Sequence, residues 1–480
     1  MDESCCRAPE PGADHNLLIL GGGSAAFAAA LRASELGARV LLVNAGTLGG
    51  TCVNVGCVPS KTLIRAAENA HWNRLSRFRG IQPGTGSRVD FPELMREKDE
   101  LVASLRQAKY VDVVAGNPQI QVLEGRAQIL DDRRVEVHGE VYLAGKILIA
   151  TGTRPAWPEI PGLDRAGVWD STAALEAKEL PRELIVLGGR YVALELGQMF
   201  ARLGSRVTIV QRSDQLLPEE DADVARALGE LLEAEGIRLR VGCQVEELAR
   251  RGDRCRVRVR PRGPQGPEAH PELLEADAVL AALGRVARCE GLAGVELDAR
   301  GFVRVGEDLQ TNLPGVYAAG DVIGEPLYVY AAAYEGGLAA ENALTGRATP
   351  RDYTGLPWVI FTDPQLAGVG LNEGQAREQG LEVDVSVLPL SAVPRALAAH
   401  DTRGFVKLLR ARGTDRLVGA RILAPEAGEQ IMEASLMIRF GLPTSEVARH
   451  FHPYLTQGEA LKLALLALDK DVASLSCCAQ

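Results

Sequence analysis

The first hydrophobic feature of the chain is the apolar run NLLIL at residues 16–20, which a glycine cluster at residues 21–23 follows directly. An alanine-rich helical segment then runs from Ala25 to about Leu36 and stops at Gly37, and a second apolar run covers residues 40–43. Short apolar runs are typical of buried parallel strands, and glycine commonly ends a helix. The pattern therefore predicts a strand, a glycine turn, a helix and a second strand, which is a βαβ unit.

The same order of elements returns near the middle of the chain. Residues 184–187 are predicted to form a strand, a Gly-Gly turn follows, residues 191–203 have helical character, and residues 207–210 form the next apolar run. A βαβ unit with glycines at its first turn is typical of dinucleotide-binding domains. The chain is thus predicted to carry two copies of one nucleotide-binding design.

The remaining segments lie between the two copies or form a third, different domain. A helix is expected at about residues 91–108, alternating strands at 122–143, and an exposed turn at the GPQGP of residues 263–267. From residue 353 onward strands such as 402–409 precede helices that begin at about residue 426. The predicted fold class is α/β, with two Rossmann-like dinucleotide-binding domains and an α+β C-terminal domain.

The expected boundaries follow from this order of elements. Residues 1–13 are predicted to be a flexible N-terminal tail, and residues 468–480 a C-terminal tail. The first nucleotide domain takes residues 14–153 and 284–350, the second takes 154–283, and the C-terminal domain takes 351–467.

Composition and charge indicate which kinds of binding partner the protein is expected to lack. Hydrophobic residues make up 46% of the 480 and charged residues 24%, as in ordinary globular proteins, and the net charge is −10. An acidic chain disfavours nucleic acid or an anionic membrane as the main partner. No apolar run approaches the roughly 18 residues of a membrane span, and the polar N-terminus does not resemble a secretory signal. We therefore expect no nucleic acid, no membrane and a cytoplasmic location.

The first glycine motif, GGGSAA, is a candidate phosphate site. Gly21, Gly23, Ala25 and Ala26 place little side chain where the strand becomes a helix, so backbone N–H groups can approach a pyrophosphate. Asn44 stands where an acidic residue usually binds the ribose, and it can still hydrogen-bond a hydroxyl. The alternative is a tight turn without a ligand.

The cysteines are the most specific chemical signal. Six of the nine lie in tight pairs, at positions 5 and 6, 52 and 57, and 477 and 478, and paired thiols in a reducing compartment indicate redox work or soft-metal binding. Cys52 and Cys57 lie in GGTCVNVGCVPSK, residues 49–61. They can meet if a helix is just starting between them, with Pro59 in an early turn. The helix N-terminus and Lys61 are then expected to lower the thiol pKa. The alternative is a pair of buried, unreactive cysteines.

These motifs together resemble the pyridine nucleotide-disulfide oxidoreductases. The resemblance runs from about residue 14 to the end of the chain. Besides the cysteine segment it rests on ATGTRP (150–155), TNLPGVYAAGD (311–321), EGRAQI (124–129) and VIFTDPQLAGVG (359–370). It implies FAD in the first domain, a nicotinamide nucleotide in the second, and dimerisation through the third.

The resemblance also implies roles for single residues. Cys57 would be the thiolate against the flavin and Cys52 the interchange thiol that faces the substrate. Lys61 would lie near the flavin and pair with Glu195, since a buried lysine needs a carboxylate partner; the alternative is that Glu195 is a solvated helix residue. The implied FAD-binding residues are Gly21, Gly23, Ala25, Ala26, Asn44, Gly50, Thr51, Lys61, Ala127, Thr151, Gly152 and Asp321.

The second glycine motif, GGRYVALE, is the candidate nicotinamide site. Gly188 and Gly189 are present, with Glu195 at its end, whereas Arg190 and Ala193 replace residues that are often glycine. After the second strand stands Gln211-Arg212 rather than an acid, which favours the 2′-phosphate of NADPH over the ribose diol of NADH. The alternative is that Arg212 is only a surface charge.

The C-terminal Cys477-Cys478 pair resembles the mercuric reductase branch of this family. Both sulfurs can serve a soft cation. The resemblance implies that Hg(II) arrives as a thiol complex and that the tail of one subunit passes it to Cys52 and Cys57 of the other, in a homodimer. Tyr191 and Tyr454 match tyrosines that line the metal site; ordinary packing is the alternative for both. Cys5 and Cys6 are a further candidate metal trap, with incidental thiols as the alternative.

A disulfide reductase is the main rival. Disulfide reductases carry a His-Pro motif with a glutamate five residues after the histidine, as an acid–base pair. Here His452 is present, but position 457 is Gln and Glu459 lies two residues too late. We therefore assign His452 no catalytic role. A metal-binding protein without turnover is a second rival, which the two cofactor motifs disfavour.

Overall fold

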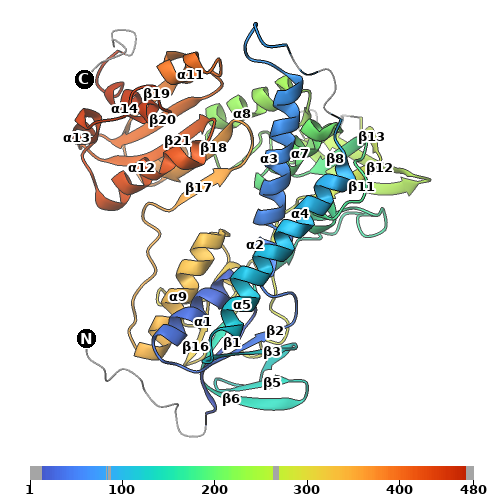
Figure 1. The fold of residues 1–480 in the computed structure, drawn as a ribbon, viewed down its shortest axis with the longest axis vertical. Helices are drawn as coiled ribbons and strands as arrows, with labels where there is room; N and C mark the ends of the chain where they lie inside the picture. Colours follow the sequence, from blue (N-terminus) through green and yellow to red (C-terminus); the bar gives the residue numbers. More distant parts are fainter. Residues whose placement is uncertain (1–12, 83, 85–87, 263–269, 472–480) are drawn as a thin grey trace. The chain divides into compact units, whose positions relative to one another are not determined.

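The structure is a computed structural model that describes residues 13–82, 84, 88–262 and 270–471 (Figure 1). The chain divides into two compact units, each made of three segments. The first unit takes residues 1–62, 93–156 and 283–352, and the second takes 63–92, 157–282 and 353–480. Each unit contains one of the two predicted βαβ designs.

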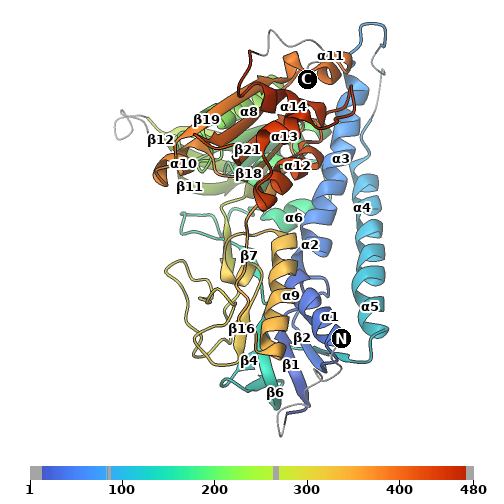
Figure 2. The same ribbon diagram turned by 90° about the vertical axis from the view of Figure 1, so that its left-hand side faces the viewer.

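The first unit is built on a parallel sheet. Strand β1 (His15–Leu20) pairs in parallel with β2 (Val40–Asn44), and helix α1 (Ser24–Glu35) connects them. The sheet order is β3-β2-β1-β6, and β16 adds to the other side of β6. Helix α9 (Val329–Thr345) lies beside α1, and both views show the two helices together (Figure 2). Glycine and alanine residues allow this close approach, because glycine has no side chain and alanine has only a methyl group.

The long strand β6 (Glu140–Ile149) takes part in two pairings. Its first residues pair antiparallel with β5, residues 144–149 pair in parallel with β1, and residues 147–149 also pair with β16. The remaining elements of the unit are β3 (Ile120–Glu124), β4 (Ala127–Ile129), β5 (Arg134–Val137), β7 (Thr153–Pro155), β15 (Arg285–Ala287), β16 (Val316–Ala318), α2 (Gly50–Val55), α3 (Cys57–Arg74, which continues into the second unit), α4 (Phe91–Arg106), a π-helical turn (Gln107–Val111), α5 (Asp112–Ala115) and a 3-10 turn (Asp321–Ile323).

The second unit contains the second nucleotide-binding sheet. Its order is β10-β9-β8-β14, all parallel, and α7 (Tyr191–Leu203) connects β8 (Glu183–Leu187) to β9 (Arg206–Val210). The other elements of this part are α6 (Ser171–Leu175), α8 (Ala222–Ala234), β10 (Arg238–Arg240), β14 (Ala278–Ala281) and the antiparallel ribbon β11 (Cys243–Arg251), β12 (Arg254–Pro261) and β13 (Glu272–Ala276).

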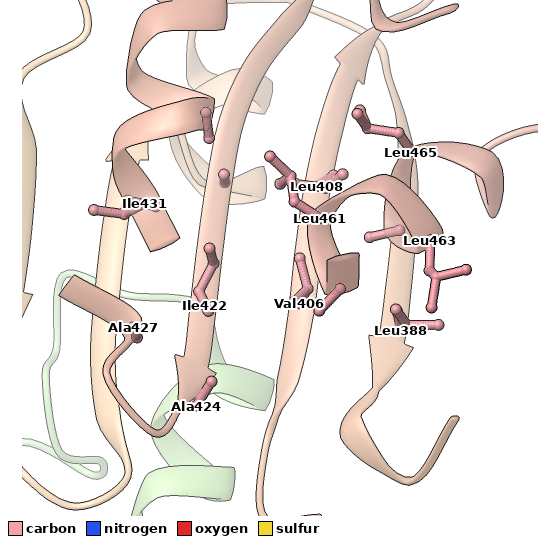
Figure 3. Close-up of a cluster of buried hydrophobic side chains, with 14 of the residues drawn as sticks. Leu388, Val406, Leu408, Ile422, Ala424, Ala427, Ile431, Leu461, Leu463 and Leu465 are labelled. Atoms are coloured by element: carbon pink, nitrogen blue, oxygen red, sulfur yellow. The ribbon is translucent and has the colours of Figure 1, made fainter. Parts of the chain in front are cut away.

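The C-terminal part of the second unit is an antiparallel sheet covered by helices. The strand order is β17-β18-β21-β20-β19, and Figure 3 shows side chains of β19, β20 and β21 meeting those of helices α12 and α14. Leu408, Ile422 and Ile431 are almost fully buried there, and each such side chain stabilises the fold by about 1.5–3 kcal/mol. The elements are β17 (Pro357–Ile360), β18 (Gln365–Gly370), α10 (Glu373–Glu378), β19 (Val383–Pro389), α11 (Pro394–Ala398), β20 (Phe405–Ala411), β21 (Leu417–Ala424), α12 (Ala427–Phe440), α13 (Thr444–Arg449) and α14 (Glu459–Leu466).

The predicted fold class is confirmed, and the strands and helices of both βαβ units lie within one or two residues of their expected bounds. The helix expected at residues 91–108 ends at Arg106 and continues as the π-helical turn. The turn predicted at residues 263–267 lies outside the described residues. Within the described part of the chain, no helix combines the length and the apolar character that crossing a membrane requires.

Candidate redox and nucleotide-binding site

A break between two helices brings Cys52 and Cys57 together. On one continuous helix, residues five apart point about 140° away from each other. Here Cys52 lies in the short helix α2, Gly56 leaves helical geometry at φ −131° and ψ −109°, and Cys57 starts the 18-residue helix α3. A Cβ on Gly56 would lie 2.9 Å from the carbonyl oxygen of Thr51. The sequence predicted one helix start at this place, whereas the structure has two, at Gly50 and Cys57. Gly56 separates them, at a position where a larger side chain would be too close to the backbone.

The two thiols interact directly. A hydrogen bond between the Cys52 and Cys57 side chains, together with burial, raises the pKa of the Cys52 thiol, and the charge of Lys61 opposes this only in part. Our expectation of a lowered pKa is therefore wrong for Cys52. Cys57 is the first residue of α3, and the dipole at a helix N-terminus favours a negative charge on its sulfur. The roles of Cys57 as the thiolate and of Cys52 as the interchange thiol stay predictions.

Two neighbours of the pair have no motif in the sequence. Asn54 donates to the carbonyl oxygens of Leu48 (2.9 Å) and Gly50 (2.8 Å), and its own oxygen accepts from Arg106 (3.1 Å), so it holds the turn. Tyr110 lies in the π-helical turn, and burial, then the charge of Cys52, raises its pKa. π-Helical turns are frequent at functional sites, but their register follows from packing rather than from local sequence.

The first glycine turn fits a dinucleotide. Gly21 has φ +125°, and a Cβ there would lie 2.1 Å from the carbonyl oxygen of Ala150. Gly50 has φ +62°, and its Cβ would lie 2.6 Å from the Cα of Gly23. Gly23 is the N-cap of α1 and offers no side chain to the first-turn N–H groups. The structure therefore leaves a cradle of backbone where a pyrophosphate would bind.

The other residues of the first motif lie around this cradle. Asn44 is the last residue of β2. Its side-chain amide donates to the carbonyl oxygen of Gly46, and its Cγ lies 2.7 Å from where a Cβ on Gly22 would be. Ala25 and Ala26 are buried in the first turn of α1. The absence of an acid at position 44 is thus compatible with the turn.

Asp321 lies in a small polar network. Its carboxylate accepts from Thr153 Oγ1 (2.9 Å), and Arg285 donates to the same hydroxyl (2.6 Å) at 3.9 Å from the carboxylate. The fully buried Glu335 of α9 accepts from the N–H of Gly320 (2.7 Å). Thr153, Arg285 and Glu335 position the aspartate, and sequence reasoning missed all three because their partners are more than ten residues away in the chain.

The remaining predicted FAD residues occupy loops and strand ends. Thr151 donates through its hydroxyl to the carbonyl oxygen of Arg288 (2.7 Å), Gly152 has φ +70°, Thr51 is exposed in α2, and Ala127 begins β4. Their contacts with FAD stay predictions.

The second glycine turn has the same backbone design. Gly188 has φ +117°, and a Cβ there would lie 2.3 Å from the carbonyl oxygen of Ala282. A Cβ on Gly189 would lie 3.0 Å from Cβ of Gln211, so the turn lies against the end of β9. Gln211 is buried and Arg212 is exposed. The residues fit a second dinucleotide.

Glu195 is buried in α7, with 6% of its surface exposed, so the alternative of a solvated helix residue is wrong. Its carboxylate accepts from the N–H of Phe361 (3.0 Å). Lys61 and Glu195 belong to different units, and their ion pair stays a prediction. Tyr191, the first residue of α7, stacks on Trp358 with 5.8 Å between ring centroids.

The His-Pro segment has a carboxylate that the sequence did not indicate. His452 Nε2 lies 2.8 Å from Glu433 of α12, whereas the buried Oε1 of Gln457 has no hydrogen-bond partner within the described residues. Tyr454 is 53% exposed. Cys5, Cys6, Cys477 and Cys478 lie outside the described residues.

Comparison with known proteins finds two family patterns in the chain. The pattern described as pyridine nucleotide-disulphide oxidoreductase matches residues 15–336, and that of the family's dimerisation domain matches residues 356–465. The chain belongs to the pyridine nucleotide-disulphide oxidoreductase family. It is therefore an FAD-dependent oxidoreductase that uses NADPH, and the dimerisation domain indicates a homodimer.

Its relatives within the family are similar over nearly the whole chain. It is 44% identical to "Mercuric reductase" of Staphylococcus aureus over 97% of this chain and 84% of that protein, and 44% identical to that of Streptomyces lividans over 97% and 98%. Among solved structures, the "HOCl-induced flavoprotein disulfide reductase RclA from Escherichia coli" is 31% identical, with a TM-score of 0.82 over 94% of this chain and 99% of that one.

Proposed function

We propose that this family member is a mercuric reductase, which consumes NADPH to reduce Hg(II) to volatile Hg(0) and so detoxifies mercury. The observation that carries the proposal is the 42–44% identity, over at least 97% of this chain, to seven proteins named mercuric reductase. In the overall reaction NADPH and Hg(II) give NADP⁺, a proton and Hg(0), so the two electrons balance. When bound, NADPH supplies the hydride and FAD relays its electrons.

The chain's own residues have distinct tasks in this proposal. Cys52 and Cys57 bind Hg(II) as soft thiolate ligands, and the proton that Cys52 holds leaves when the metal binds. Lys61 and Glu195 pair beside the flavin, and Tyr191 and Tyr454 line the metal site. Gly188, Gly189 and Arg212 hold NADPH. The hydrogen bond between the two thiols and the burial of Glu195 support these assignments.

The C-terminal pair is the delivery device in this proposal. Cys477 and Cys478 of one subunit take Hg(II) from a small thiol complex and pass it to Cys52 and Cys57 of the other subunit by thiol exchange. The dimerisation-domain match supports a second subunit. We also propose a cytoplasmic location, because free thiol pairs need a reducing compartment.

One assay tests the function. The purified protein is mixed with NADPH and excess small thiol, with and without HgCl2, while NADPH oxidation and mercury vapour are recorded. Oxidation that depends on Hg(II), with Hg(0) release that Cys52→Ala abolishes, is the expected result. If Hg(II) only inhibits while oxidised glutathione or lipoamide is turned over, the protein is a disulfide reductase instead.

A further inference from the structure

Arg190 occupies an unusual place in the second nucleotide-binding turn. It is the N-cap of α7, directly after Gly188 and Gly189, at a position where the glycine motif often has no side chain. Its side chain is 59% exposed, and its guanidinium lies 3.3 Å from the carboxylate of Glu219. An exposed pair of this kind contributes about 0–1 kcal/mol, so a phosphate can displace the carboxylate at small cost.

The backbone segment that carries Glu219 is held in place by buried cations and an amide. Arg421, whose side chain is 1% exposed, donates to Glu220 (2.6 Å), and the fully buried Lys407 donates to Asp221 (3.1 Å). The amide of Asn372 donates to the carbonyl oxygen of Glu219 itself (2.8 Å). Residues 219–221 are thus fixed to the C-terminal sheet, and Glu219 presents its carboxylate to Arg190 from a rigid backbone.

The same loop leads from the ribose-binding end of β9. Gln211 lies against Gly189, and the N–H of Leu217 donates to the carbonyl oxygen of Gly189 (2.9 Å). The loop of residues 212–219 therefore starts at Arg212 and folds back onto the glycine turn. Arg212 is the first residue of this loop, and Arg190 pairs with Glu219, its last residue. A 2′-phosphate binds beside the end of this strand in the Rossmann design.

We propose that Arg190 is a specificity-determining residue for NADPH, whose guanidinium exchanges Glu219 for the 2′-phosphate. Arginine suits this task because its planar fork binds phosphate oxygens with two hydrogen bonds. In the free protein, the ion pair with Glu219 keeps the guanidinium near the glycine turn. Without Arg190, the same carboxylate repels the phosphate. The inference rests on the proposed use of NADPH and extends it to a residue outside the usual position after β9.

Flavin reduction without mercury tests this inference. The loss of flavin absorbance is followed anaerobically in a stopped-flow instrument with NADPH and with NADH, and binding of 2′,5′-ADP and 5′-AMP is titrated. We expect Arg190→Ser to lower the second-order rate with NADPH and the affinity for 2′,5′-ADP by about tenfold or more, since a charge-assisted bond is lost. NADH and 5′-AMP should change by less than about twofold.

Matched variants separate the role from a folding effect. Arg226 pairs with Glu230 at 4.0 Å on the exposed face of α8. The control Arg226→Ser should change neither the rate nor the affinity for either nucleotide. Glu219→Gln combined with Arg190→Ser should recover part of the loss, because no unpaired carboxylate then faces the phosphate. If Arg190→Ser fails to fold with FAD, Arg190→Lys replaces it and should keep part of the preference.

Two outcomes would overturn the inference. An equal loss with NADPH and NADH would place Arg190 on the pyrophosphate common to both, and no loss with either would make it a surface charge. These outcomes are distinct from failure of the proposed function, in which the wild-type flavin is reduced by NADPH but Hg(II) is not turned over.

Discussion

The imidazole Nε2 of His452 lies 2.8 Å from the carboxylate of Glu433, a residue nineteen positions earlier on α12. Its Nδ1 faces the carbonyl oxygen of His450 at 3.1 Å. The ring is therefore held between two oxygen atoms, and position 457, where disulfide reductases carry a glutamate, does not supply its partner. The structure gives the histidine a carboxylate from a different element.

Substitutions in this pair should distinguish a mercuric reductase from a disulfide reductase. Thiolate exchange around Hg(II) needs no proton donor at the leaving sulfur, so His452→Gln and Glu433→Gln should each change Hg(II)-dependent NADPH oxidation by less than about threefold. Gln457→Glu should not create glutathione or lipoamide reduction. A loss of a hundredfold in Hg(II) turnover with intact FAD, roughly the size of a lost acid–base catalyst, would contradict this assignment.

Substitution of Cys52 and substitution of Cys57 should have different effects on the visible absorbance of the reduced protein. Because Cys57 begins α3 and the pKa of its partner Cys52 is raised, we expect the reduced protein to show long-wavelength absorbance of a Cys57 thiolate beside the flavin. Cys57→Ala should abolish this absorbance and Cys52→Ala should retain it, while either substitution reduces Hg(II) turnover to background. Absorbance that follows Cys52 instead would reverse the two roles.

Gly21 should be essential for FAD binding. Alanine at φ +125°, with its Cβ 2.1 Å from the Ala150 carbonyl oxygen, should lower the free energy of unfolding by about 2 kcal/mol or more and reduce the FAD content of the purified protein. The control is Gly46→Ala, where no atom lies within 4 Å of the Cβ position. Thermal unfolding and the ratio of flavin to protein absorbance measure both effects. Equal FAD content in the two variants would contradict the cradle.

His71 should contribute to acid sensitivity. Burial, together with the charge of Arg202, lowers the pKa of His71 below its usual value of about 6.5, so the folded protein disfavours the protonated ring. The resulting stability is present above the unfolded pKa and is lost as the pH falls below it. His71→Gln should show a smaller loss of thermal stability between pH 7.5 and pH 5.5 than the wild type. The exposed His270→Gln is the control, and an identical pH dependence in all three proteins would contradict the prediction.

The C-terminal cysteines should act across subunits. Cys477→Ser/Cys478→Ser should slow Hg(II) turnover at low, near-stoichiometric small thiol, and Cys52→Ala/Cys57→Ala should be inactive. When the two variants are mixed and allowed to exchange subunits, one of the two sites in a hybrid dimer has both a wild-type tail and wild-type redox cysteines if the tail acts in trans. Recovered activity supports delivery between subunits, and no recovery in verified hybrids contradicts it.

Local sequence determined the two βαβ units. The run at residues 16–20, the glycine turns and the alanine-rich helix need only neighbouring residues to specify a strand, a turn and a helix, so their bounds were predicted within one or two residues. The reactive cysteines were also readable, because their spacing and flanking glycines are local. The break at Gly56 was not foreseen, because it depends on the close approach of this position to the carbonyl oxygen of Thr51, which leaves no room for a Cβ.

The tertiary structure decided which distant side chains meet. Glu433 beside His452, Thr153 and Arg285 beside Asp321, and Glu219 beside Arg190 join residues that lie between 19 and 168 positions apart in the chain. Hydrophobic periodicity specifies which face of an element is buried, but it carries no information on which element covers that face or in what register. The sequence by itself therefore determined the family of chemistry and the backbone cradles. Packing of the sheets and helices decided which partners hold each predicted site side chain, because those contacts depend on three-dimensional proximity alone.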